Sequence, residues 1–179
     1  MIGAALYFKN KITNNFHLPC GMIGPTLFDV VAITGLFVSG PTATFDMKPE
    51  RRCNIIEKNS YGEFIKHNMG DDGSPFTDDE YVAFLYYWFN AIVFCLRSVS
   101  MQKLFIPLAG LIHEKRKFSL AKLLLGSLYD ELGQMINSLR SKTLISAGGP
   151  LWLLQLWLNA IFEKTYKTQR NCLHRKTKH

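Results

Sequence analysis

Two short segments place metal-binding types of side chain close together. His17 and Cys20 are both common zinc ligands, but no second pair of ligands follows at the spacing that a zinc site needs. Asp71 and Asp72 could bind calcium, but the twelve-residue pattern of oxygen ligands found in an EF-hand is missing. We therefore expect a structural turn at the first segment, a solvated loop at the second, and no metal at either.

A third segment begins like a catalytic motif. His113 and Glu114 follow the start of the zinc-protease pattern, but Lys117 stands where that pattern has its second histidine. The chain also lacks the glycine-rich loops that hold phosphates or dinucleotides, and the Gly-x-Ser-x-Gly turn of serine hydrolases. The sequence therefore predicts no catalytic residue, no cofactor and no enzyme.

The positive charge of the chain is concentrated at its C-terminal end. Residues 163–179 hold six of the 21 Lys and Arg residues but one of the 14 acidic residues, so this end carries +5 and residues 1–162 carry +2. Arg170, Arg175, Lys176 and Lys178 could form a nuclear-import signal or contact nucleic acid. The alternative, which we favour, is a solvated and disordered end. Nucleic-acid binding is expected only through this tail, because the remainder is almost neutral.

One strongly apolar helix is expected to organise the core. It begins at Gly148-Gly149-Pro150, because proline suits the first helical position and glycine suits the turn before it. Apart from a narrow polar stripe that includes Gln155 and Asn159, its residues are apolar, so we expect other elements to cover it on nearly every side. Its main partner is expected to be the helix of residues 81–97. Asn90 and Gln155 are each expected to make one interhelical hydrogen bond.

Helix start signals divide the rest of the chain. Thr26, Ser60 and Thr77 each stand three residues before an acidic residue, which is the spacing of a helix cap. Ser119 is expected to cap a long helix with a clear 3.6-residue period. The expected elements are a hairpin over residues 15–24, helices over 26–34, 60–69, 77–97, 105–113 (begun or kinked at Pro107), 119–139 and 150–163, and a long connection over 38–59. The fold class is mainly α: a compact multi-helix domain with a short N-terminal β-hairpin and a disordered basic C-terminal tail.

The cysteines and the apolar runs bear on location. The four cysteines lie far apart without a CxxC pair, so we expect reduced thiols in an intracellular protein. The longest nearly apolar run, residues 81–96, is shorter than the roughly 20 residues that span a membrane. We therefore expect a soluble chain without a membrane segment.

Five segments, taken in order, carry a family resemblance: residues 15–36, 81–88, 105–109, 119–130 and 148–159. The first reads Asn-Phe-His-Leu-Pro-Cys-Gly-Met-Ile-Gly-Pro-Thr from Asn15, and the last reads Gly-Gly-Pro-Leu-Trp-Leu-Leu-Gln-Leu-Trp-Leu-Asn from Gly148. Together they resemble the plant mobile domain, also called the aminotransferase-like mobile domain, which occurs in transposon-related and Maintenance of Meristems-like proteins. The resemblance implies a helical domain without an established catalytic residue set. No lysine here matches a pyridoxal-phosphate site, whatever the family's name suggests.

The resemblance also implies a boundary and a role. We expect a partial plant mobile domain over residues 1–163 and a basic tail over 164–179, hence a truncated copy. The implied role is that of a non-enzymatic nuclear interaction module in meristem development and transposable-element silencing, with phosphatase-like nuclear proteins as partners. The alternative is a truncated transposon-derived relic without cellular function. For location, the alternative to the nucleus is the cytoplasm.

Overall fold

The computed structural model describes residues 2–41, 48–58, 60–71, 73–95, 101–145 and 148–162. These residues fold mainly as helices, with one two-stranded antiparallel sheet. The predicted mainly α fold with an N-terminal hairpin is therefore confirmed. The predicted tail, residues 164–179, lies outside the described residues.

The hairpin forms where the Pro-Cys-Gly turn was expected. Strand β1 (Phe16–Leu18) pairs with β2 (Gly21–Ile23), so that Phe16 stands opposite Ile23. Gly21 has a φ of 134°, a conformation that favours glycine and allows the chain to return after Cys20. A short helix, α1 (Ile2–Leu6), precedes the hairpin.

Three helices begin at the predicted caps: α2 (Leu27–Thr34), α3 (Tyr61–Asn68) and α4 (Asp78–Trp88). At α2 and α4 the threonine and the acid three residues later bond each other's backbone N–H, which satisfies two donors that a helix start otherwise leaves unpaired. Gly35 ends α2 in the left-handed conformation, at a φ of 69°. These boundaries follow from local chemistry alone.

The α-helix expected over residues 77–97 ends at Trp88, and a π-helix begins at Phe89. Residues Phe89–Val93 form this π-helix, η1, and the next two residues, Phe94 and Cys95, are not helical. Asn90 is fully buried here; its Nδ2 donates to the Tyr86 carbonyl oxygen at 2.8 Å, and its Oδ1 accepts from the backbone N–H of Gln102 at 2.7 Å. Asn90 therefore has the structural role expected of it, but among the described residues it bonds its own helix and the segment before α5, so the interhelical bond expected of it is not found there.

Two further helices follow, α5 (Phe105–His113) and α6 (Leu120–Arg140). Pro107 lies in the first turn of α5, where its missing N–H breaks no helical hydrogen bond. The prediction that the Ser119 side chain caps α6 is wrong. Ser119 occupies the N-cap position of α6, but its side chain makes no cap bond, and its buried Oγ has no hydrogen-bond partner among the described residues.

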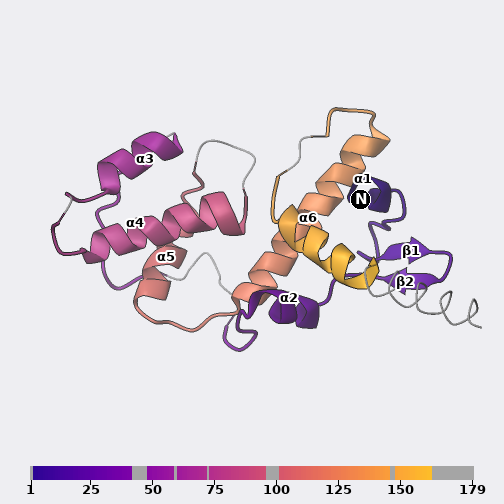
Figure 1. The fold of residues 1–179 in the computed structure, drawn as a ribbon, viewed down its shortest axis with the longest axis horizontal. Helices are drawn as coiled ribbons and strands as arrows, with labels where there is room; N and C mark the ends of the chain where they lie inside the picture. The colour runs from indigo at the N-terminus through magenta and orange to yellow at the C-terminus, as the bar shows by residue number, and fades with distance from the viewer. Residues whose placement is uncertain are drawn as a thin grey trace, which may run out of the picture.

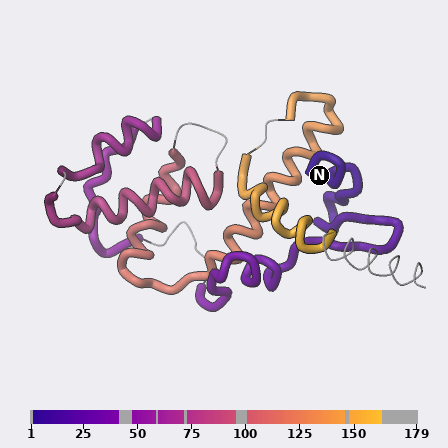
Figure 2. The backbone as a smooth tube through the Cα atoms, viewed as in Figure 1, coloured from indigo at the N-terminus to yellow at the C-terminus, as the bar shows by residue number. Residues whose placement is uncertain are grey.

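Figure 1 shows the helices in two groups. In the first group α4 packs against α5 and α3. In the second group α6 packs against α2 and α1, with the hairpin and the helix of residues 151–162 beside it. The chain passes from the first group to the second along the connection between α5 and α6 (Figure 2).

The helix of residues 151–162 is buried on one side only. Leu153, Leu154, Trp157 and Leu158 are buried, whereas Leu156 and Phe162 are 48% and 42% exposed. The expectation that other elements cover it on nearly every side is therefore wrong, because it lies across α6 and the hairpin with its opposite side in solvent (Figure 1).

The prediction that this helix packs mainly on the helix of residues 81–97 was only partly right. The Trp157 ring stacks on Phe16 of β1, with the ring centroids 5.9 Å apart. The start of the helix contacts the end of η1, where Trp152 Nε1 donates to the Val93 carbonyl oxygen. Gln155 makes no bond to another helix in the described structure: its Nε2 donates to Asn159 Oδ1, one turn further along its own helix, at 2.8 Å. Within the described residues, no helix is both long and apolar enough to cross a membrane.

Candidate functional site

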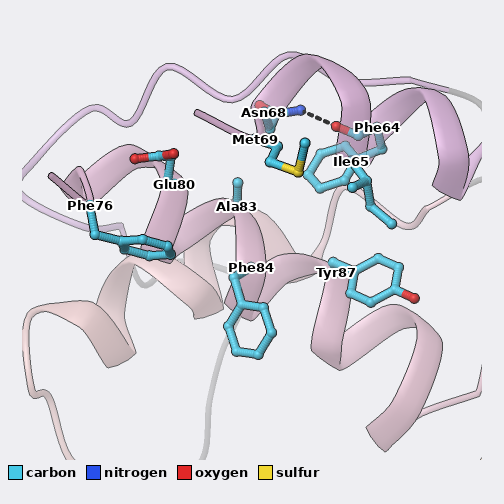
Figure 3. A pocket seen from close by; sticks show the side chains of 9 residues that line it. All are labelled: Phe64, Ile65, Asn68, Met69, Phe76, Glu80, Ala83, Phe84 and Tyr87. Carbon is cyan, nitrogen blue, oxygen red and sulfur yellow. Dashed lines mark hydrogen bonds between the residues drawn. The ribbon is translucent and has the colours of Figure 1, made fainter. Parts of the chain in front are cut away.

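An apolar groove lies between α3 and α4, and we call it the α3–α4 groove. Phe64 and Ala83, both buried, form its floor. Its volume is about 170 Å³. Figure 3 shows the side chains of α3 and its end facing those of α4 across the groove. The full lining is Phe64, Ile65, Asn68, Met69, Phe76, Glu80, Ala83, Phe84 and Tyr87.

The walls of this groove are unusually exposed for their residue types. Phe76 is 74% exposed, Met69 is 68% and Phe84 is 53%. Single exposed apolar side chains are common on protein surfaces, but a cluster of them around a hollow is typical of a binding site. The groove can therefore take up apolar side chains from a ligand.

Two polar side chains of the lining, those of Asn68 and Glu80, already bond the protein itself. Asn68 Nδ2 donates to the carbonyl oxygens of Ile56 and Phe64, both at 2.9 Å, and its Oδ1 accepts from the Ile56 N–H at 3.0 Å. These bonds fix the end of α3 to the connection before it. Asn68 is thus a structural residue of the groove.

Glu80 holds the other end of the groove in place. Its Oε2 accepts from the backbone N–H of Thr77 at 2.7 Å, and its Oε1 accepts from the N–H of Gly70 at 2.6 Å. The hydrogen bonds from Thr77 lower the pKa of Glu80 below its ordinary value. A carboxylate held ionised in this way is a poor general acid.

The elements that form this groove are acidic, in contrast to the chain as a whole. Residues 60–71 and 73–88 include five acidic residues and one lysine, whereas the whole chain has a net charge of +7. Arg51 offsets part of this charge, because it pairs with Asp78 and lies 3.6 Å from Asp79. The described residues of 48–118, which form the whole first group of helices and its connections, hold eight acidic residues and nine Lys and Arg residues, so charge does not select a ligand for the groove.

A second apolar hollow, of about 160 Å³, lies between α1, the hairpin and the end of the 151–162 helix. Its lining consists of Ala4, Ala5, Phe8, Phe16, Leu18, Ile23, Leu158 and Phe162. Because no polar side chain lines it, nothing orients a ligand there. We therefore regard the α3–α4 groove as the candidate site.

The residues with possible metal chemistry take structural positions. His17 lies in β1 with its Nε2 3.0 Å from Thr13 Oγ1, and Cys20 is exposed on the hairpin turn, as expected for a structural turn. Asp71 stands in the loop predicted for it and accepts from Ser74 through its backbone carbonyl. Asp72 lies outside the described residues. Among the described residues, no three His, Cys, Asp or Glu side chains gather as they would around a metal ion.

His113 and Glu114 join a network of ion pairs at the C-terminal end of α5. His113 Nε2 lies 3.3 Å from Asp78 Oδ1, and Glu114 Oε1 accepts from the Arg51 N–H at 3.1 Å. The hydrogen bond from Arg51 is the main reason why the pKa of Asp78 is lowered. The network ties the connection before α3 to α4 and α5. Neither His113 nor Glu114 lines the α3–α4 groove.

The predicted basic cluster of Arg170, Arg175, Lys176 and Lys178 lies outside the described residues. The structure therefore places none of these side chains relative to the groove.

Lys9 is a buried cation that the sequence did not indicate. It is 6% exposed, and its Nζ donates to the Asn14 carbonyl oxygen at 2.6 Å. The same nitrogen lies 5.3 Å from the ring centroid of Phe16 and 4.9 Å from that of Tyr129. Burial lowers the pKa of Lys9 to about 8. No carboxylate within the described residues forms a salt bridge with it, so the aromatic rings and one carbonyl oxygen provide its polar surroundings.

A comparison with protein-family models matches the chain to a known family. The model described as "Plant mobile domain" matches residues 9–178 and so covers the hairpin, every described helix after α1 and most of the basic tail. No curated protein matches the chain, and no solved structure does.

Proposed function

The chain belongs to the plant mobile domain family, and from this membership we propose that it is a non-enzymatic interaction module of the nucleus. The role implied by the family resemblance is in meristem development and transposable-element silencing. Phosphatase-like nuclear proteins are the partners that the same resemblance suggests. The basic C-terminal residues, which fit a nuclear-import signal, support the nuclear location.

The observation that carries the proposal is the α3–α4 groove. It presents exposed Phe76, Met69 and Phe84 around a buried floor, and covering such side chains removes apolar surface from water at about 25 cal/mol per Å². A partner that inserts one or two apolar side chains would bury this surface. Binding is therefore the chemistry that the groove supports best.

The polar groups of the groove support a non-enzymatic role. Asn68 and Glu80 are both engaged with backbone groups of the protein, so neither is free to transfer a proton or attack a substrate. The remaining lining residues are apolar apart from the hydroxyl of Tyr87.

A second reading, a transposon-derived relic without cellular function, rests on a different surface. Leu156 and Phe162 leave an apolar side of the 151–162 helix exposed, as expected if covering elements have been lost. A thermal melt of the full chain distinguishes the two readings. A cooperative transition supports the interaction module, whereas helical signal without a transition supports the relic.

The binding proposal can be tested with a matched pair of variants. Phe84→Ser removes a groove side chain, and Phe28→Ser removes an equally large, 85% exposed side chain from α2. The probe is a purified phosphatase-like protein from plant nuclei, titrated with the full chain by calorimetry. We expect binding to weaken at least about tenfold in Phe84→Ser and to be unchanged in Phe28→Ser.

Two results would contradict the proposal. One is an absence of binding, or equal binding by all three proteins. The other is exclusion of a fluorescently tagged full chain from the nucleus of plant cells, which would leave a nuclear role without support.

A further inference from the structure

α3 is the more weakly packed of the two helices that wall the α3–α4 groove. Of its eight residues, Phe64 is the one that is buried. α4 is anchored by four buried residues, Val82, Ala83, Leu85 and Tyr86. A segment with few buried apolar side chains opens at a lower free energy than the rest of a fold. We therefore expect α3 to leave its place before α4 does.

Two ring contacts join α3 to α4. The Phe64 ring lies edge-on to Tyr86, with the ring centroids 5.4 Å apart, and the Tyr61 ring lies edge-on to Tyr87 at 5.5 Å. Tyr61 and Tyr87 are only partly buried. The packing of α3 thus depends mainly on one anchor, Phe64.

Hydrogen bonds hold the C-terminal end of α3 and the residues after it. Asn68 bonds the backbone of Ile56 in the connection before α3, and the Gly70 N–H donates to Glu80 Oε1 at the start of α4. At the other end of α3, the described structure shows no hydrogen bond to another element. The Asn68 and Gly70 bonds are therefore the polar contacts that detachment of α3 would have to break.

α3 and its C-cap present two exposed apolar side chains, Ile65 and Met69, to the groove (Figure 3). Phe84, also exposed, belongs to the opposite wall. An apolar side chain inserted between the two walls would be covered from both sides, and α3 would gain buried apolar surface that it lacks in the free protein. A ligand that binds the closed arrangement better than the open one shifts the population toward the closed one.

We propose that α3 is a lid of the α3–α4 groove. It detaches from α4 while the rest of the fold stays closed, and it closes over an apolar side chain bound in the groove. The closing step rests on the proposed function, because it requires a ligand in that groove. The opening step is a property of the free chain and is tested without a ligand.

The length of α3 makes its opening measurable. A helix of eight residues is too short to persist in water by itself, so α3 loses its helical hydrogen bonds when it detaches. Its amide hydrogens then exchange with solvent. The rate of this exchange therefore reports how often the lid opens.

The first test is hydrogen–deuterium exchange of the full chain, followed by mass spectrometry. Peptides that report on residues 65–70 and on residues 82–88 are compared, after correction for the intrinsic exchange rates of their sequences. We expect the α3 amides to exchange at least about 100-fold faster than those of α4. Low concentrations of urea should accelerate exchange in α4 and barely change it in α3, because opening the lid exposes little surface.

A matched pair of variants tests the bonds at the end of α3. Asn68→Ala removes the hydrogen bonds to Ile56 and leaves the Phe64 anchor in place, so exchange in α3 should accelerate about tenfold while exchange in α4 stays the same. Lys66→Ala changes an exposed residue of the same helix and should leave both rates unchanged.

The closing step is measured with the same purified phosphatase-like protein that tests the groove. At about ten times its dissociation constant, this protein should slow exchange in α3 about tenfold, because binding removes the open state in proportion to occupancy. The slowing should be lost in Phe84→Ser and kept in Phe28→Ser.

Three outcomes overturn the inference. In the first, the α3 and α4 peptides of the free chain exchange at the same rate. In the second, Asn68→Ala accelerates both peptides equally. In the third, the phosphatase-like protein binds in a Phe84-dependent way without slowing exchange in α3, so the lid is wrong and the proposed function stands. If that protein does not bind, the proposed function fails, and exchange in the free chain alone decides whether α3 opens.

Discussion

The indole Nε1 of Trp152 donates a hydrogen bond to the backbone carbonyl oxygen of Val93 at 3.0 Å. The two residues are 59 positions apart in the chain, and the bond joins the start of the 151–162 helix to the end of η1. A second bond, from the Gly149 N–H to the Cys95 carbonyl oxygen at 2.9 Å, joins the same two segments. These bonds connect the two groups of helices at a point distant from the α5–α6 connection.

Replacing Trp152 with Phe should weaken this connection. We expect the free energy of unfolding to fall by about 1–2 kcal/mol, because the Val93 carbonyl loses a partner while a ring still fills much of the space. Urea denaturation of the full chain measures the change. Trp88→Phe is the control, since Trp88 is also partly buried and the described structure shows no hydrogen bond from its side chain. Equal losses in both variants would show that ring volume matters and the bond does not.

Replacing Gly149 with Ala should destabilise the fold more than the same change at Gly35. Both glycines have positive φ angles, 71° and 69°, so both variants place alanine in a left-handed conformation that costs about 1–2 kcal/mol. An added Cβ at Gly149 would lie 2.8 Å from Glu131 Cγ, whereas one at Gly35 would meet nothing within 4 Å. We expect an additional loss of about 1–3 kcal/mol at Gly149 from this overlap. If Gly149→Ala and Gly35→Ala gave the same denaturation curve, the close approach of Gly149 to Glu131 would be contradicted.

Replacing Asn90 with Ala should cost about 2–4 kcal/mol of stability. Asn90 is fully buried, and its loss leaves the Tyr86 carbonyl oxygen and the Gln102 N–H without this partner. Asn159→Ala is the control, because Asn159 is exposed and bonds only Gln155 in the described structure, so a change within about 0.5 kcal/mol is expected there. A change at Asn90 no larger than the change at Asn159 would argue against the described end of α4.

Lys9 should make stability depend on pH in a mildly alkaline range. Its folded-state pKa of about 8 lies below the ordinary value of 10.5, so the folded protein loses this proton first as pH rises. The free energy of unfolding should therefore rise by about 2 kcal/mol from pH 7.5 to 9.5, and this gain is lost as the pH falls through 8. Denaturation at several pH values measures the slope.

The control for Lys9 uses two methionine variants. Lys9→Met should remove the rise in stability, because methionine has no proton to release, and the buried thiols of Cys53 and Cys95, whose raised pKa values act in the opposite direction, can only lower stability as the pH rises. Lys11→Met, at an exposed lysine in the same segment, should retain the rise. Measurements stay below pH 9.5, because burial raises the pKa of Tyr129 above its ordinary value of 10, and ionised tyrosine would add a second transition. If stability still rose with pH in Lys9→Met, the rise would have to come from a group other than Lys9.

The parts of the fold that could be predicted from the sequence are those decided by local chemistry. Thr26, Thr77 and Gly35 mark helix ends because their bonds and dihedral angles involve residues only a few positions away. The π-helix at Phe89 could not be predicted in this way. Its buried Asn90 bonds Gln102, a residue twelve positions later, and such a partner leaves no periodic signal in the chain.

The candidate site was predictable only in its components. The helices that carry Phe64 and Phe84 were expected, but Phe84 was assigned to a helix that packs on the 151–162 helix. The structure instead packs α4 on α5 and α3, which leaves Phe84 at the surface. Lys9 was missed for a related reason: its partners Phe16 and Tyr129 come from the hairpin and from α6, and only the fold brings them together.

The exposed thiol on the hairpin turn offers a way to orient the molecule on a surface. Cys20 is exposed, whereas Cys53 and Cys95 are partly buried and burial raises the pKa of both thiols, so Cys20 is the most reactive of the described cysteines. In a Cys172→Ser background, a maleimide-coated sensor chip would attach the chain by its hairpin end. The opposite end, with the α3–α4 groove, would then face the flowing solution, and every immobilised molecule would present that groove to an injected peptide.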